Sequence, residues 1–351
     1  MAEKLGKIDH HLFEDFIQDK CGANRNEVAV KPGFGVDVSV VDLPGDMAMA
    51  LTSDPLSLIP TLGLKESAWL SVQLMANDMA TTGFSPMYGQ LVLNLPAEFS
   101  REDFKIYWDY IHEFCEDIGI AITGGHTGFI EGQNSTIAGG GTLITVAPKK
   151  DILTVKNASA GDSILVTKTC ALSSAAILAM SFPETVIDKI GKEKHKEACD
   201  SFYQTSSLQD ALIAAGKNRE HQDITAMHDV TEGGVLGAIY ELAEASQNGA
   251  LIFNQNLPVN DLQKDICTIF SLDPRFCIGA GSMIITCKKD AAKTLISRLE
   301  KENIPCAEVG ELTAREKGIK LKEGDEMKDL IYYEEDPYWA AFFNALKAGW
   351  K

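Results

Sequence analysis

The sequence predicts an α/β protein with two domains. Segments with the apolar pattern of strands alternate along the chain with segments of helical periodicity, in about equal number. The length of 351 residues is sufficient for two hydrophobic cores. The pattern loosens at residues 148–162, so we place the boundary there and expect domains at 1–155 and 156–351.

Apolar periodicity locates the elements of the first domain. Strands are predicted at 47–54, 87–96, 120–128 and 136–147. Residues 67–82 predict a helix, and a second helix follows Ser100, because Ser100 and Asp103 resemble a capping box before apolar residues at spacings of three and four. The strand at 120–128 is expected to enter a glycine turn at TGGHTG.

The second domain is predicted from the same patterns. Strands are expected at 163–168, 223–229 and 282–286, and helices at 172–182, 184–200, 206–216, 233–246 and 289–302. The polar stretch 314–336 is interpreted as loop and sheet-edge structure. The chain closes with PYWAAFFNALKAGW, which predicts a docking helix.

Composition restricts the classes of partner. The net charge is −18, from 50 acidic against 32 basic residues, and such a surface repels nucleic acid and anionic lipid. We therefore expect no nucleic-acid or membrane partner. The N-terminus lacks the apolar core of a signal peptide, and the eight cysteines contain no C-x-x-C pair, which predicts a cytoplasmic protein with free thiols. A chemical role of Cys21 or Cys170 stays open.

Polar residues collect where apolar strands end. Asp54 follows one strand, GGHT at 124–127 follows another, and His228 with Asp229 follows a third. Ordinary turn chemistry explains each segment alone. Their recurrence favours a shared cleft, because ligands of α/β proteins bind beyond the carboxyl ends of strands.

A carboxylate in an apolar helix strengthens this interpretation. The helix containing Asp78 is apolar on nearly every side, so Asp78 should be buried and needs a cation or strong donors, unless 77–83 has frayed into solvent. Asp37, Asp54 and Asp78 offer oxygen donors, and Mg²⁺ accepts such carboxylates together with phosphates. No Walker A pattern occurs. His126 and His228 have no third ligand at a spacing typical of zinc.

Several motifs in a fixed order carry a family resemblance. They are GFGVDVSVV (33–41), LTSDP (51–55), ANDMATTGFSP (76–86), TGGHTG (123–128), GDSILVTKT (161–169) and AMHDVTEGGV (226–235). In this order they resemble the AIR synthase-related superfamily. That superfamily includes aminoimidazole ribonucleotide synthetase, the hydrogenase-maturation protein HypE, thiamine-monophosphate kinase and selenophosphate synthetase.

The resemblance implies a PurM-like two-domain fold, with N-terminal sheets pairing into a barrel across a homodimer and a C-terminal α/β domain. It implies Mg²⁺ as cofactor and ATP as substrate. The implied metal ligands are Asp37, Asp54 and Asp78. The implied ATP and phosphate contacts are Asn77, Gly124, Gly125, His126, Thr127, Lys168, Thr231, Gly233 and Gly234. The candidates for a catalytic role are His126, His228 and Asp229.

Departures from the family patterns leave the acceptor open. MHDVTEGG is most similar to HypE-like proteins, but no cysteine follows Cys306, whereas HypE ends in a cysteine that carries its carbamoyl group. Gly128 stands where HypE has a lysine. One hypothesis is a Mg²⁺- and ATP-dependent enzyme that transfers a phosphoryl group to an unidentified small-molecule or protein-bound nucleophile. The other is a non-catalytic nucleotide-binding maturation or accessory protein.

Overall fold

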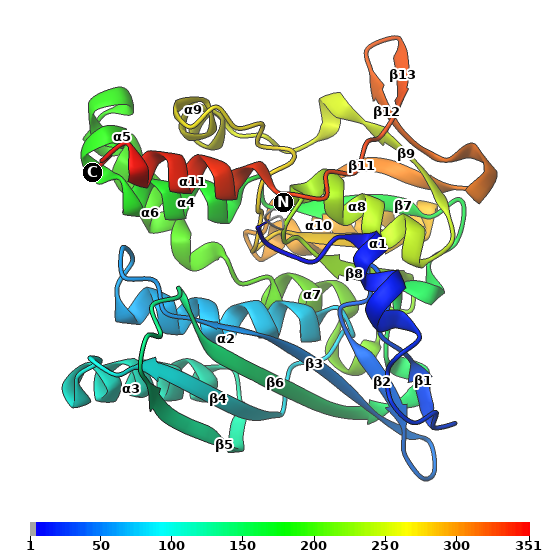
Figure 1. Cartoon of the computed structure of the whole chain (residues 1–351). Coiled ribbons are helices and arrows are strands. Elements are labelled where there is room, and N and C mark those ends of the chain that lie inside the picture. Colours follow the sequence, from blue (N-terminus) through cyan, green and yellow to red (C-terminus); the bar gives the residue numbers. More distant parts are fainter. Residues whose placement is uncertain (1–4) are drawn as a thin grey trace.

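Each half of the chain forms its own β-sheet in the computed structural model, which describes residues 5–351 (Figure 1). This confirms the mixed α/β class and the two-domain organisation. No helix within the described residues is long and apolar enough to span a bilayer.

The N-terminal sheet has two long central strands and two helices on one face. Its strand order is β1-β2-β3-β6-β4-β5, and all neighbours are antiparallel except β4 and β5. The strands are β1 (Val28–Val30), β2 (Ser39–Asp42), β3 (Met47–Ser57), β4 (Tyr88–Pro96), β5 (Ala121–Ile130) and β6 (Ile137–Pro148). Helices α2 (Leu64–Ala80) and α3 (Arg101–Asp117) cover one face, as Figure 1 shows. Ser100 caps α3 by accepting from the N–H of Asp103, as predicted.

The C-terminal sheet is covered on both faces. Its strand order is β13-β12-β9-β11-β7-β10-β8. The strands are β7 (Ser163–Thr167), β8 (Ile224–Asp229), β9 (Gly249–Phe253), β10 (Met283–Cys287), β11 (Cys306–Thr313), β12 (Ile319–Glu323) and β13 (Glu326–Asp329). Helix α8 (Gly234–Ala245) packs on one face, and α7 (Leu208–Ala215) with α10 (Ala292–Lys301) on the other. Every residue of β7, β8 and β10 is buried as a result, which explains their continuous apolar runs.

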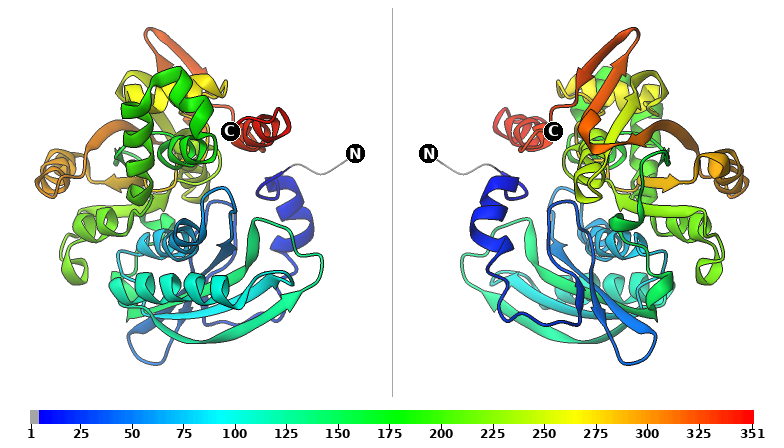
Figure 2. Two further views of the ribbon diagram at one scale, coloured as in Figure 1. Left: turned by 90° about the vertical axis from the view of Figure 1, so that its left-hand side faces the viewer. Right: turned by 90° about the vertical axis from the view of Figure 1, so that its right-hand side faces the viewer.

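The remaining helices lie beside this sheet and at the chain ends. They are α4 (Leu172–Ser181), α5 (Pro183–Ile190), α6 (Lys192–Asp200), α9 (Asp261–Ile269) and α11 (Pro337–Lys347), with the short α1 (His10–Phe13) near the N-terminus. Figure 2 shows the N-terminal segment and α11 on the same side of the molecule.

Two predicted elements are wrong. The single helix at 184–200 is two helices, because Gly191 has φ +84 between α5 and α6. The glycine turn at 124–127 is instead part of β5, which continues to Ile130. Gly125 pairs with Leu91, and a Cβ there would overlap the Leu91 carbonyl oxygen, so this glycine serves close strand pairing. Strands β1, β2, β9 and β11 and helix α9 were not among the predicted elements.

Candidate acidic cation and phosphate site

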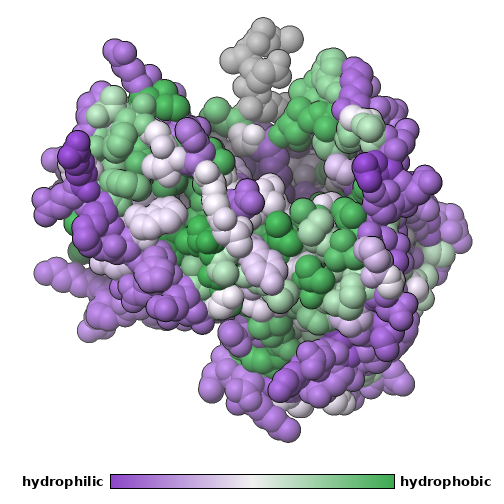
Figure 3. Space-filling model, turned by 90° about the horizontal axis from the view of Figure 1, so that it is seen from below, coloured by the Kyte–Doolittle hydropathy of each residue, from purple (hydrophilic) through white to green (hydrophobic). Residues whose placement is uncertain are grey.

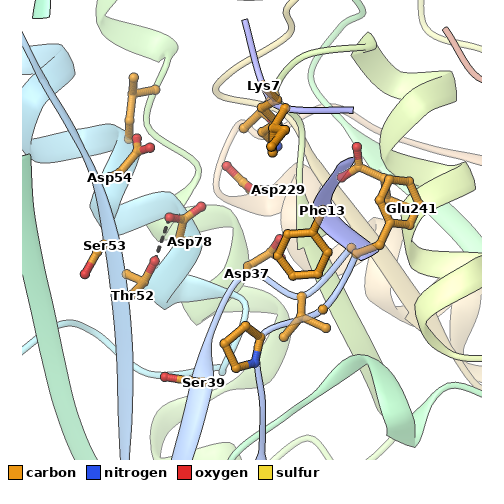
Figure 4. Close-up of a pocket in the computed structure, with 18 of the residues that line it drawn as sticks. Lys7, Phe13, Asp37, Ser39, Thr52, Ser53, Asp54, Asp78, Asp229 and Glu241 are labelled. Atoms are coloured by element: carbon orange, nitrogen blue, oxygen red, sulfur yellow. Dashed lines mark hydrogen bonds between the residues drawn. The ribbon is translucent and has the colours of Figure 1, made fainter. Parts of the chain in front are cut away.

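An acidic cavity of about 670 Å³ lies between the two domains (Figure 4). The N-terminal domain contributes β3, α2 and the loop before β2. The C-terminal domain contributes the end of β8, Thr231, Glu241 of α8 and Tyr332. The cavity is therefore assembled by the packing of the two domains.

Carboxylates from four separate elements meet in this cavity. Asp37 comes from the loop before β2, Asp54 from β3, Asp78 from the last turn of α2, and Asp229 from the end of β8. Thr52, two residues before Asp54 on the same strand face, donates to Asp78 Oδ2 at 2.8 Å and so links β3 to α2. The structure thus brings together the three aspartates assigned to metal at the sequence level, and adds Asp229.

These carboxylates lack sufficient positive charge nearby. Burial, together with the charge of Glu232, raises the pKa of Asp54 to about 6. Burial and the charge of Asp37 raise the pKa of Asp229 to about 7. Burial and the neighbouring aspartates raise the pKa of Asp78 well above its ordinary value. All three groups would ionise more readily if a cation entered the cavity.

His228 supplies one fixed positive charge beneath the cavity. Its Nδ1 lies 2.6 Å from Asp37 Oδ2, and its Nε2 lies 3.1 Å from Glu241 Oε2. Burial opposes protonation, but the charges and hydrogen bonds of Asp37 and Glu241 raise the His228 pKa well above its ordinary value. Glu241 also accepts from Tyr332 Oη at 2.7 Å, which extends the chain of contacts into the segment before α11.

The donor set fits a hard divalent cation. Ligand atoms of Asp37, His228 and Asp229 all lie within 4.8 Å of one another. Both His228 nitrogens already contact carboxylates, whereas the buried Asp229 Oδ2 has no hydrogen-bond partner among the described residues. The oxygens of Asp229, Asp37, Asp54 and Asp78 are the donors that Mg²⁺ prefers, and His228 holds Asp37 from behind.

Two residues assigned to ATP by resemblance are placed elsewhere. Asn77 is buried between the domains, where its Nδ2 donates to Thr205 O at 3.0 Å and its Oδ1 accepts from Ser207 N at 2.7 Å. Lys168 Nζ donates to the carbonyls of Ser206 and Gly281 and pairs with Asp210 at 3.0 Å. Neither residue lines the cavity. Their side chains hold the domain interface and the loop after β7.

The GGHT motif lies apart from this cavity. Gly124, Gly125, His126 and Thr127 lie on the exposed edge strand β5 and do not line this cavity. Thr231 lines the cavity.

The glycines before α8 are committed to packing. The Gly233 N–H donates to Asp336 Oδ2 at 2.7 Å, so the carboxylate that caps α11 occupies this donor. Gly234 has φ +63, and a Cβ would lie 2.7 Å from Arg275 O, so this glycine serves close packing.

Sequence reasoning missed three residues of the site: Lys7, Glu241 and Tyr332. Glu241 carried a usable signal, because it is a charge on the apolar side of α8, the same argument that identified Asp78. Lys7 and Tyr332 carried none, since each reaches the cavity from a terminal segment far away along the chain.

Comparison with known proteins agrees with this architecture. The family model for the N-terminal domain of AIR synthase related protein matches residues 35–146. The family model for its C-terminal domain matches residues 159–322. The chain belongs to the AIR synthase related family. The N-terminal match contains Asp37, Asp54 and Asp78, and the C-terminal match contains Asp229 and Glu241.

Individual relatives and solved structures cover between 70% and 94% of the chain. A selenide, water dikinase of Methanococcus maripaludis is 30% identical over 317 residues, which cover 86% of this chain and 90% of the relative. The carbamoyl dehydratase HypE of Escherichia coli is 25% identical over 253 residues, covering 70% of each chain. Among solved structures, hydrogenase maturation protein HypE in complex with ATP has a TM-score of 0.69 at 18% identity, covering 94% of this chain and 96% of its own.

Proposed function

We propose that this AIR synthase related protein binds ATP with Mg²⁺ and transfers a phosphoryl group to a small-molecule or protein-bound nucleophile. The observation that carries the proposal is the acidic cavity, in which Asp229 Oδ2 is unpartnered and the pKa of each of Asp54, Asp78 and Asp229 is raised. An acidic cavity of this kind requires a cation, and a cation allows a protein of net charge −18 to bind a polyanion. Relatives named as kinases and an ATP-bound structure of the same fold support ATP as the substrate.

The residues of the chain would divide the work of binding and positioning. Asp37, Asp54, Asp78 and Asp229 would hold Mg²⁺, which when bound supplies positive charge to the phosphate oxygens. His228 keeps Asp37 in place through the 2.6 Å contact, so that the carboxylate does not have to be ordered when ligand binds. The protein's own contribution to phosphoryl transfer is positioning and charge, and the cavity provides both.

A non-catalytic accessory protein is the second candidate. It is favoured by the commitment of Asn77 and Lys168 to hydrogen bonds outside the cavity. A phosphotransferase or slow ATPase activity that Asp54→Asn abolishes would reject this candidate. Nucleotide binding without any turnover would support it.

We also propose that the domain boundary lies at residues 155/156. A further proposal is that two copies of the chain pair through the N-terminal sheet. The face of this sheet opposite α2 and α3 carries exposed apolar side chains, and Figure 3 shows apolar residues gathered on the side of the molecule where this sheet lies. They include Tyr88, Val92, Ile130 and Ile137. An exposed edge strand such as β5 beside such a face favours association with a second sheet.

Asp78→Asn tests the proposed function. Calorimetry should show that wild type binds a non-hydrolysable ATP analogue only with Mg²⁺ present, and that Asp78→Asn weakens this binding by at least tenfold. The matched control is Asp46→Asn, at an exposed turn outside the cavity, which should bind as wild type does. Folded wild type that binds no nucleotide with Mg²⁺ would overturn the proposal.

The same variant gives a second measurement without ligand. The raised pKa of Asp78 means that its ionised form destabilises the folded protein above the ordinary pKa of 3.8. Asp78→Asn should therefore be more stable than wild type towards urea at pH 7 without Mg²⁺. This result shows that lost binding is not caused by unfolding.

A further inference from the structure

We propose that Lys7 is a phosphate ligand of this site, carried by an N-terminal segment (residues 5–13) that closes over the cavity. The inference rests on the proposed function. It extends that function to a segment that precedes both family matches, the first of which begins at residue 35. It also identifies the group that Lys7 would bind as a phosphate.

Both the backbone and the side-chain ammonium group of Lys7 are held by the segment that follows β8. Its backbone N–H donates to Glu232 Oε2 at 2.9 Å, and its Nζ donates to Thr231 Oγ1 at 2.8 Å. The residue lies at the rim, while its ammonium group points into the cavity (Figure 4). A lysine on an unattached chain end would not be held in this way.

The rest of the N-terminal segment is docked on the same wall. Gly6 has φ +97, and a Cβ there would overlap Glu232 and lie 2.8 Å from Trp339 Nε1, so the chain passes through a gap that admits glycine. His10 stacks on Phe34 with ring centroids 4.1 Å apart, and Phe34 meets Tyr332 edge to face at 5.3 Å. These contacts hold the segment between the loop before β2 and the segment before α11.

The ammonium group faces the carboxylates across the cavity. Burial lowers the pKa of Lys7, but the charges of Glu241, Asp229, Asp37 and Asp78 outweigh burial and raise it overall. Lys7 is therefore a permanent cation at neutral pH. Its effect on the carboxylates is reciprocal, because its charge lowers the pKa of both Asp54 and Asp229.

A ligand between these two walls must satisfy both. A divalent cation on the carboxylate side attracts an anion, and the ammonium on the opposite side attracts the same anion. A terminal phosphate group fits, because its several oxygens can contact a metal and an ammonium at the same time. Thr231 Oγ1, which now accepts from Lys7, adds a hydroxyl donor at the same place.

The competing explanation is that Lys7 takes the place of the metal in the free protein. In that case the ammonium would be a competitor of Mg²⁺, and its removal would strengthen Mg²⁺ binding. Removal of a competitor would also strengthen binding of the Mg²⁺-loaded analogue, whereas removal of a phosphate ligand should weaken it, although the lost positive charge favours Mg²⁺ in both cases. The two explanations therefore predict opposite results.

The experiment uses the full-length chain with Lys7→Met and Lys7→Arg. Calorimetry measures the affinity for MgCl₂ alone, and then for a non-hydrolysable ATP analogue with Mg²⁺. Lys7→Met should weaken analogue binding about tenfold to a hundredfold, and Lys7→Arg should retain most of the affinity. Lys20→Met, in the same N-terminal region but outside the cavity, should bind as wild type does.

A second readout follows the segment itself. Tryptic cleavage after Lys7 in wild type should be slower with Mg²⁺ and the analogue than without them, while cleavage after Lys20 serves as the reference. Unchanged or tighter analogue binding in Lys7→Met would overturn the assignment of Lys7. Failure of the proposed function gives a different result, because wild type itself would then not bind the analogue.

Discussion

Replacing Glu241 with glutamine removes a charge on which the floor of the cavity depends. Glu241 is buried on α8, accepts hydrogen bonds from His228 and Tyr332, and lies near the positive charge of Lys7. Burial acts to raise the pKa of Glu241, but Lys7, His228 and Tyr332 outweigh it and lower the pKa to about 2. The ionised carboxylate therefore stabilises the folded protein.

The size of this effect follows from the pKa. Lowering the pKa from an ordinary 4.5 to about 2 corresponds to about 3 kcal/mol of stability at neutral pH. Because the folded-state pKa is the lower one, this stability is fully present above pH 4.5 and is lost as the pH falls through about 2. Glu241→Gln should thus lower the free energy of unfolding by about 3 kcal/mol at pH 7. The difference from wild type should narrow below pH 4.5.

Urea denaturation at a series of pH values measures this difference. Glu244→Gln is the matched control, because Glu244 lies on the same helix outside the cavity and its loss should change stability by less than about 0.5 kcal/mol. The electrostatic reasoning is refuted if Glu241→Gln destabilises no more than Glu244→Gln. It is also refuted if the difference between wild type and Glu241→Gln is the same at pH 4 as at pH 7.

Two further predictions concern the domain interface and the proposed dimer. Asn77→Ala leaves the buried N–H of Ser207 without its partner and should lower the free energy of unfolding in urea by about 1–3 kcal/mol. Calorimetry should show unchanged nucleotide affinity in this variant. A loss of affinity without a loss of stability would contradict the structural role of Asn77. Val92→Lys places a charge on the exposed face of the N-terminal sheet and should shift the sedimentation coefficient towards that of a monomer, whereas Met327→Lys, at an exposed residue of β13, should not. Dimers that persist in Val92→Lys would count against this interface.

The C-terminal sheet could be predicted largely because its central strands are covered on both faces. Continuous apolar runs such as 224–229 and 283–287 result directly from that burial. Prediction failed where a single backbone angle decides the structure. Gly191 breaks a helix whose side chains give no sign of the break, and Gly125 reads as a turn residue although it lies within a strand.

The site could be predicted in part, for a different physical reason. A carboxylate in an apolar helix or at the end of a buried strand must find a partner wherever the chain folds, so Asp78 and Asp229 could be identified locally. Asp54 does not follow its strand as predicted, because β3 continues past it to Ser57. Asn77 directly precedes Asp78 in the sequence, but successive residues of a helix point in different directions. The Asn77 side chain therefore points to the other domain. Whether a side chain of this helix contacts a ligand or the domain interface depends on the direction in which it points and on how the domains pack. A short sequence motif specifies neither of these.

The segment MHDVTEGGV shows how far a short motif determines function. Successive residues of this segment turn to different parts of the chain: His228 to Asp37 and Glu241, Asp229 into the cavity, Thr231 to Lys7, and Gly233 to Asp336. The partners come from the N-terminal domain and from both terminal segments, so the segment joins all the parts that form the cavity. Because Gly233 is already satisfied by Asp336, α8 does not offer that donor to a phosphate, and the positive charge facing the carboxylates comes from Lys7. The motif therefore identifies the family, whereas the lysine that we propose as a phosphate ligand lies 224 positions away from its partner Thr231 along the chain.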